Sequence, residues 1–220
     1  MAIYNGGILG EYKNKVGNVV GRKWRNLDVM SKYQPDVSNP RTEKQQNQRK
    51  MFGELSRVAK ALRVPLRIGM SGVAAGTKNP YRTQFISRNK ECATISGGSV
   101  VIDYLNMKVA EGGYPYALST GSPSFDEPLT VAVTFSYTAI AGLTKTTDKV
   151  YLVVYNPGDG MALMDSVAAS AGSINVVVPN SWNGEIVHVW AFVVDGDVDG
   201  VPTMASQVTP SHYVGNGSIS

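Results

Sequence analysis

Apolar residues between positions 51 and 62 recur every three or four residues, which is the spacing of one face of an α-helix. The members of this stripe are Met51, Phe52, Leu55, Val58, Ala59 and Leu62. Upstream, Thr42 and Gln45 fit the T-x-x-Q capping box that starts a helix, and Asn39-Pro40 opens the turn before it. The pattern predicts a helix of about 20 residues whose first half is polar and solvated and which ends at Pro65.

A second helix start follows at Asn79-Pro80, ahead of the mixed polar and apolar residues 81–86. This segment predicts a short helix that ends near Asn89. Residues 69–76 are rich in glycine and are expected to form a loop between the two helices.

Beyond residue 99 the pattern changes to short runs rich in valine, tyrosine and threonine, separated by turn residues. The predicted strands cover residues 99–109, 129–138, 149–156, 173–178, 185–194 and 205–214. About seven short strands at this spacing predict an antiparallel β-sandwich of immunoglobulin-like type. Within residues 185–194, Trp190 and Phe192 share one face with His188, while the alternate positions are apolar too, so this strand is expected to be central.

Residues 1–36 are rich in glycine and hold few large apolar side chains. We expect an extended basic arm or hairpin that satisfies neither its backbone nor its apolar groups alone and docks on another molecule. The predicted fold class is therefore mainly β with an N-terminal α segment. It has an arm at residues 1–36, one or two helices in a helical segment at residues 37–98, and an immunoglobulin-like antiparallel β-sandwich at residues 99–220.

Composition fits a folded protein of 220 residues that is 43% hydrophobic and can bury a real core. No window approaches 18 uninterrupted apolar residues, and no secretory signal is visible at the N-terminus, so we expect no membrane partner. The single cysteine, Cys92, has no partner for an internal disulfide, which fits a reducing compartment or an assembly made in one.

The net charge of +4 conceals two opposite halves. Residues 1–90 carry 18 lysines and arginines against 5 acidic residues, a net of +13, whereas residues 91–220 carry 3 against 12, a net of −9. This asymmetry predicts either an acidic partner for the first part or attraction between the two halves of neighbouring copies.

The segment 195–200 reads Asp-Gly-Asp-Val-Asp-Gly and matches the start of a calcium loop, in which Asp195, Asp197 and Asp199 would converge on the cation. The loop's twelfth position, where a bidentate glutamate is needed, is Ser206, and the flanks read as strands. An ordinary acidic hairpin tip is therefore the favoured interpretation, and calcium is the alternative.

No catalytic constellation is visible. The two histidines, His188 and His212, lie in predicted strands, and no nucleophile motif accompanies Cys92. The chain lacks G-x-S-x-G, H-E-x-x-H, a C-x-x-C pair and a phosphate-binding loop. We expect no enzymatic activity and no cofactor.

Nucleic acid is the main competing partner, because basic and aromatic residues are interleaved in the first 50 positions and could contact phosphates and bases. These residues are Tyr12, Arg22, Lys23, Trp24, Arg25, Lys32, Tyr33, Arg41, Lys44, Arg49 and Lys50. The alternative is that they meet an acidic protein surface. No zinc-finger, homeodomain or RNA-recognition signature supports the nucleic-acid interpretation.

A resemblance to a known family adds to this picture. The residues that carry it are Gly6-x-x-x-Gly10, Val16-Gly17-Asn18-Val19-Val20-Gly21-x-x-Trp24 and Asn39-Pro40-x-Thr42-x-x-Gln45-x-x-x-Arg49-x-x-Phe52. Together they resemble a family without a settled function that is found in Bacteroidota genomes and their phages, and the resemblance extends into the sandwich. The part of the third run from Asn39 to Arg49 is also similar to small phage structural proteins. The resemblance implies association with a virion and supplies no catalytic residues.

We therefore expect a non-enzymatic structural protein of a tailed phage, capsid- or tail-associated, that is made in the bacterial cytoplasm and located in the virion. Its expected partners are other virion proteins and further copies of itself, and multiple copies would add avidity to weak contacts. The expected contact residues are Arg22, Trp24, Arg25, Arg49 and Phe52. A nucleic-acid-binding accessory protein is the second hypothesis, and a host-encoded adhesion or surface module is the third.

Overall fold

The computed structural model describes residues 3–5, 11–24, 27–36, 41–77, 79–115, 117–138, 140, 144–145, 147–198 and 200–220. The chain divides into two compact units, residues 1–42 and 43–220, which we call the N-terminal unit and the main unit. This division differs from the expected one, because the helical segment and the sandwich belong to the same unit.

The N-terminal unit is a four-stranded antiparallel sheet. Its strands are β1 (Ile3–Asn5), β2 (Glu11–Val16), β3 (Val19–Trp24) and β4 (Leu27–Lys32), each paired with the next in the chain. The turn between β2 and β3 uses Gly17 at a φ of 58°, where glycine is favoured. The expectation that this region cannot satisfy its own backbone is wrong, because β2, β3 and β4 pair with one another.

The first predicted helix is confirmed as α1 (Glu43–Ala61), which begins directly after Thr42. Pro65 does not end it. The helix ends at Ala61 and the chain continues as α2 (Arg63–Gly69), in which Pro65 occupies the first turn, where a missing N–H is tolerated.

The expected loop at residues 69–76 is also partly helical, since it contains α3 (Ser71–Ala74). The second predicted helix is confirmed as α4 (Tyr81–Arg88), followed by a 3₁₀ turn, η1 (Lys90–Cys92). Asn89 is fully buried after α4, where its side-chain amide donates to the Phe85 and Lys108 carbonyls at 2.9 Å each and so joins two chain segments.

A short hairpin, β5 (Ala93–Ser96) and β6 (Ser99–Ile102), lies in the helical layer. The strand predicted at residues 99–109 is therefore shorter than expected and pairs with β5, not with the sandwich. Gly97 and Gly98 form the turn with φ values of 58° and 82°, a conformation that suits a two-residue hairpin loop.

The sandwich consists of two antiparallel sheets. One contains β7 (Ala117–Thr120), β8 (Thr130–Thr138) and β11 (Ser173–Val177) in the order β11-β8-β7. The other contains β9 (Lys149–Asn156), β10 (Met161–Ala168), β12 (Ile186–Val194) and β13 (His212–Ser218) in the order β10-β9-β12-β13. Short 3₁₀ turns η2 (Ala169–Ala171), η3 (Asn180–Trp182) and η4 (Ala205–Gln207) connect them.

Lettered in chain order, these sheets are ABE and C′CFG, an immunoglobulin-like arrangement that confirms the predicted fold class. β7 and β10 were not predicted, and β13 begins later than expected because residues 205–207 form a 3₁₀ turn.

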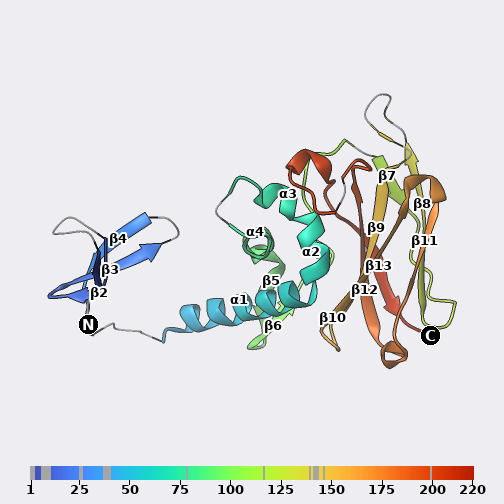
Figure 1. The fold of residues 1–220 in the computed structure, drawn as a ribbon. Coiled ribbons are helices and arrows are strands. Elements are labelled where there is room, and N and C mark those ends of the chain that lie inside the picture. The colour runs from blue at the N-terminus through green and yellow to red at the C-terminus, as the bar shows by residue number, and fades with distance from the viewer. Residues whose placement is uncertain are drawn as a thin grey trace. The chain divides into compact units, whose positions relative to one another are not determined.

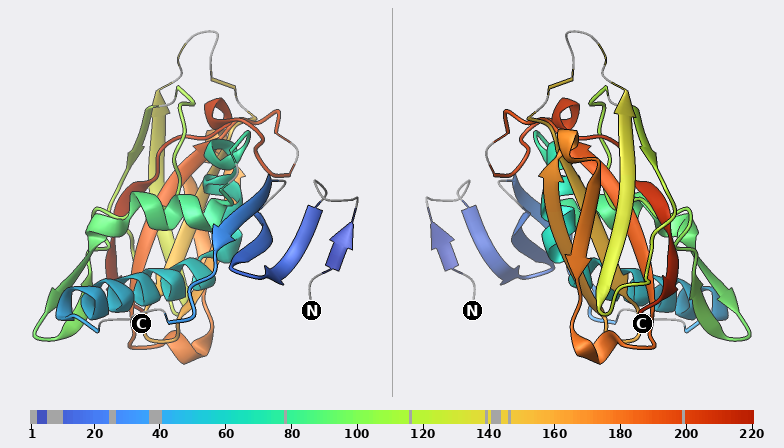
Figure 2. Two further views of the ribbon diagram at one scale, coloured as in Figure 1. Left: turned by 90° about the vertical axis from the view of Figure 1, so that its left-hand side faces the viewer. Right: turned by 90° about the vertical axis from the view of Figure 1, so that its right-hand side faces the viewer.

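The main unit has three layers (Figure 1). Helices α1, α2 and α4 cover one face of the C′CFG sheet, and the ABE sheet covers the other; a quarter turn shows α1 and α4 in front from one side and β8 from the other (Figure 2). Accordingly, Trp190 and Phe192 of β12 pack with the helices, while Val189 and Val193 pack with the ABE sheet. The prediction of a central strand with two apolar faces is confirmed.

Candidate functional site

An exposed stripe runs along the first half of α1. Gln45, Gln48, Arg49 and Phe52 follow one another at helical spacing, so they share one side of the helix, and all are exposed. Phe52 retains 58% of its accessible surface, and together with Gly53 these residues line an open groove. We call these five residues the α1 stripe. Figure 1 shows the first turns of α1 extending past α4.

Phe52 was predicted to join the apolar stripe that packs on the core, and this is wrong. The buried face of α1 is formed by Leu55, Val58 and Ala59. Helical spacing alone does not show whether an apolar residue at the edge of the stripe is buried. Its burial depends on how wide a surface of the protein covers the helix.

Of the five expected contact residues, two lie on the α1 stripe and two, Arg22 and Trp24, lie in β3. Arg22 is exposed on β3 opposite Val29. Trp24 ends β3 opposite Leu27, but its side chain, like all of Arg25, lies outside the described part of the structure. Arg49 and Phe52 are brought together on the α1 stripe. Their role in assembly stays a prediction.

The N-terminal sheet has an exposed apolar face. Val16 pairs with Val19, and Met30 pairs with Gly21, so Val16, Val19 and Met30 project from the same face. They retain 51%, 37% and 69% of their accessible surface. On the opposite face, the Lys15 ammonium lies 3.5 Å from the centre of the Tyr33 ring, a cation–π contact.

Cations gather on the helical part of the main unit. Residues 43–90 contain eleven lysines and arginines against two glutamates, a net of +9. Arg57 pairs with Glu54, and Arg88 lies 2.7 Å from Glu111. Most of the others are exposed: Lys44, Arg49, Lys50, Lys60, Arg63, Arg67, Arg82 and Lys90. The layer is a basic surface.

A small polar cavity of about 190 Å³ lies between α1 and the turn that follows β9. Glu54 and Arg57 of α1 face Tyr104 and Tyr155 across it. Burial raises the pKa of Tyr155 well above its ordinary value. The electrostatic interaction with Tyr104 and the hydrogen bond between the two residues raise it further, so this phenol stays neutral. No sequence motif indicates the cavity, because its walls come from separate segments.

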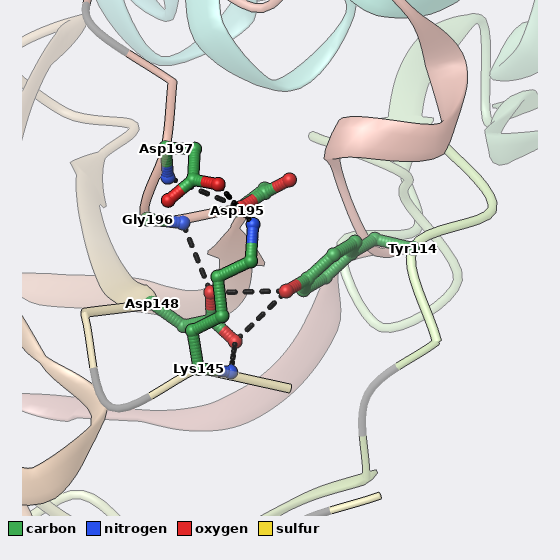
Figure 3. A network of polar contacts seen from close by, with 6 residues as sticks. All are labelled: Tyr114, Lys145, Asp148, Asp195, Gly196 and Asp197. Carbon is green, nitrogen blue, oxygen red and sulfur yellow. Dashed lines mark hydrogen bonds and ion pairs between the residues drawn. The ribbon is translucent and has the colours of Figure 1, made fainter. Parts of the chain in front are cut away.

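A buried carboxylate organises one end of the sandwich (Figure 3). Asp148 is fully buried and accepts hydrogen bonds from the Tyr114 hydroxyl and from the backbone N–H groups of Lys145 and Gly196, all at 2.9 Å. Burial, followed by the hydrogen bond to Asp148, raises the pKa of Tyr114, which therefore stays a proton donor. The network joins three chain segments that are distant in sequence.

A lysine from another segment lies against the acidic loop considered for calcium. The Lys145 ammonium lies 2.8 Å from the Asp195 carboxylate and also contacts Asp197 (Figure 3). Burial acts to raise the pKa of Asp195, but the hydrogen bonds from Lys145 and from the Asp197 backbone outweigh it and lower the pKa overall. Asp199 lies outside the described residues, and within them no cluster of three or more His, Cys, Asp or Glu could hold a metal.

Neither described histidine joins a catalytic grouping. Burial lowers the pKa of His188 to about 4, its ring stacks on Tyr104 with 4.1 Å between centroids, and its Nδ1 lies 2.9 Å from the Tyr213 hydroxyl. His212 is exposed at the start of β13. Burial raises the pKa of the Cys92 thiol, which favours its unreactive neutral form.

The sequence comparison covers both units. A family model described as a family of unknown function, DUF6266, matches residues 10–215. The chain belongs to this family. The DUF6266 match runs from the N-terminal sheet through the helices into β13, so the α1 stripe and the sandwich are both within it. No curated protein matches the chain. None of the described helices of this DUF6266 protein is long and apolar enough to cross a membrane.

Proposed function

We propose that this protein is a non-enzymatic structural component that builds a larger assembly through its N-terminal unit and the α1 stripe. One observation carries the proposal: Val16, Val19 and Met30 form an exposed apolar face on a sheet that has already paired its backbone. Among the described side chains of this unit, none of the apolar ones is buried. Covering such a face with a partner removes apolar surface from water, which is energetically favourable.

The charge distribution supports assembly with acidic partners. The exposed cations of the helical layer and Arg22 on β3 would steer and orient an acidic protein surface. A single contact between two such surfaces is weak, but many copies in a lattice make many contacts at once, and together these stabilise the assembly.

We place this role in a phage virion, as a capsid- or tail-associated component. The support is the resemblance of the run from Asn39 to Arg49 to small phage structural proteins. Arg49, the last residue of that run, and Phe52, one turn further along, lie exposed on α1, where a partner can reach them.

The test is to follow the protein and its variants into purified particles. Val16→Thr combined with Val19→Thr should reduce incorporation about tenfold or more, because polar side chains weaken the apolar contact. The matched control is Val177→Thr on β11, a valine that is 75% exposed and lies outside both proposed surfaces. Absence of the wild-type protein from particles, as measured by mass spectrometry, would contradict the virion assignment. Equal incorporation of both variants would contradict the role of the N-terminal face.

The second candidate is a nucleic-acid-binding accessory protein, which the exposed cations of the helical layer favour. If it is correct, the affinity for duplex DNA should fall steeply as salt rises, with a slope near the number of phosphates neutralised. The structural role predicts weak binding and a shallow slope.

A further inference from the structure

Gly53 lies within α1, where no close contact in the described part of the chain requires a glycine. Of the three glycines in the described helices, two have an internal reason: a Cβ on Gly69 would lie 2.6 Å from the Ala110 Cβ, and one on Gly72 would meet the Met204 carbonyl. A Cβ on Gly53 would meet nothing within 4 Å. Glycine in the middle of a helix is less favourable than alanine, and none of the described residues of the main unit makes a contact at Gly53 that compensates for it.

The neighbours of Gly53 indicate what the glycine is for. It lies beside Phe52, which is 58% exposed, and both belong to the α1 stripe. A missing side chain lets another backbone approach a helix closely, and an aromatic ring beside it supplies apolar contact area. This combination suits a surface against which another molecule packs.

The charge of α1 restricts the occupant. The helix carries Lys44, Arg49, Lys50, Arg57 and Lys60 against Glu43 and Glu54. Two α1 stripes placed face to face would bring like charges together, which disfavours a symmetric contact. The complementary partner is acidic.

The sandwich of this chain presents such a surface, which we call the acidic end: Asp126, Glu127, Asp159 and Glu185, all exposed. The Glu185 carboxylate would lie 2.8 Å from a Cβ on Gly158, next to Asp159. The two residues after β13 join this site to residues 125–129, because the Ile219 N–H donates to the Glu185 carbonyl and the Leu129 N–H donates to the Ser220 carbonyl, both at 3.1 Å. Residues 121–130, 156–160 and 178–186 contain no lysine or arginine, and Arg57 and Lys60 of α1 border the surface beside Asp159. Ile186, 56% exposed, adds an apolar side chain there.

We infer that the α1 stripe receives the acidic end of the sandwich of a second copy of this chain. The inference rests on the proposed assembly function and names the partner for one of its surfaces. The contact joins two different surfaces, so in a pair one copy keeps an unused acidic end and the other keeps an unused stripe. Contacts of this head-to-tail type build open chains or closed rings.

The test uses two full-length variants that each lose one surface. Arg49→Glu with Phe52→Ala removes the stripe, and Glu127→Lys with Glu185→Lys removes the acidic end. By sedimentation velocity, the wild type should associate as its concentration rises, and each variant alone should associate about tenfold more weakly or worse. An equimolar mixture should form one-to-one pairs, because the intact stripe of one variant meets the intact acidic end of the other.

Matched controls change the same charges elsewhere. Arg67→Glu on α2, and Glu91→Lys with Asp165→Lys, alter exposed residues outside both surfaces and should leave self-association unchanged. Gly53→Leu is a second stripe variant that introduces a helix-favouring residue and blocks close approach, and it too should weaken association about tenfold. If the double stripe variant fails to fold, as judged by circular dichroism, Gly53→Leu replaces it in the test.

Three results would overturn the inference. If the acidic-end variant self-associates as strongly as the wild type, the stripe must contact another stripe or an N-terminal unit. Two variants that stay monomeric when mixed would exclude a head-to-tail contact. A wild type that stays monomeric at every concentration would exclude a second copy as the partner, while the proposed function would survive if the stripe variants still failed to enter particles.

Discussion

The N-terminal sheet and the C′CFG sheet of the sandwich are both four-stranded and antiparallel, yet among the side chains that the structure describes only those of the second sheet form a core. β12 buries alternate side chains into both the helical layer and the ABE sheet, and Trp190 and Phe192 are fully buried. The N-terminal sheet leaves Val16, Val19 and Met30 exposed. The difference shows that backbone pairing and apolar burial are separate requirements, and that a sheet can meet the first without the second.

The physical reason lies in what each contributes to stability. A backbone hydrogen bond replaces one to water and contributes about 1 kcal/mol net, whereas burial of apolar surface contributes about 25 cal/mol per Å². A paired sheet without a covered face is therefore marginal in isolation. The N-terminal unit is suited to gaining stability from a partner, and the main unit already has its own.

The largest effect should follow from truncating the shared core. Phe192→Ala removes a fully buried ring, and we expect it to lower the free energy of unfolding of the main unit by about 3–5 kcal/mol. Met30→Ala in the N-terminal unit, where the side chain is 69% exposed, should change it by less than about 0.5 kcal/mol. Urea denaturation followed by circular dichroism measures both, and similar losses would break the comparison.

The Asp148 network should be the next most sensitive part of the main unit. Asp148→Ala leaves the Tyr114 hydroxyl and the N–H groups of Lys145 and Gly196 without their acceptor, which should cost about 3 kcal/mol or more. Tyr114→Phe removes only one donor and should cost about 1 kcal/mol. A loss for Asp148→Ala no greater than that for Tyr114→Phe would show that the network does not join the segments as described.

The stability of the main unit should depend on pH through His188. Its pKa is lowered to about 4 in the folded protein from an ordinary value of 6.5, so the unfolded chain binds the proton more readily. The stabilisation by the neutral ring is complete above pH 6.5 and is lost as the pH falls toward 4. This window should account for up to about 3 kcal/mol, less whatever solvent access to the ring relieves.

Replacing the ring tests the pH effect. His188→Gln should flatten the fall in unfolding free energy between pH 6.5 and 4, while His212→Gln, which alters the exposed histidine, should retain it. An unchanged pH dependence in His188→Gln would mean that other groups set it.

The smallest effect concerns Gly53 and has an unusual sign. Gly53→Ala adds a methyl group to open space in α1, and we expect it to raise the unfolding free energy by about 0.5–1 kcal/mol. Gly69→Ala is the matched control and should destabilise, since its Cβ would lie 2.6 Å from that of Ala110. Thermal melting compares the two, and a destabilised Gly53→Ala would show that the glycine has an internal role.

The extent of prediction from sequence varies with the kind of signal. The periodicity of residues 51–62 located α1, and the two-faced pattern of residues 185–194 identified a central strand, because each reflects burial on a fixed geometric period. β10 escaped prediction because it lies at a sheet edge and alternates only weakly, with side chains that are half-buried or exposed. The cavity beside Glu54 and Arg57 had no sequence signal, since its walls meet only in three dimensions.

The sequence by itself determined the fold class, the start of α1 and the opposite charges of the two parts, since these follow from local periodicity and from composition. Only the tertiary structure decided that the helices and the sandwich share one core, that Phe52 faces outward, and that Lys145 lies between Asp195 and Asp197. The reason is that burial and ion pairing depend on which distant segments meet. A local pattern shows that a residue needs a partner, but the fold determines which partner it has.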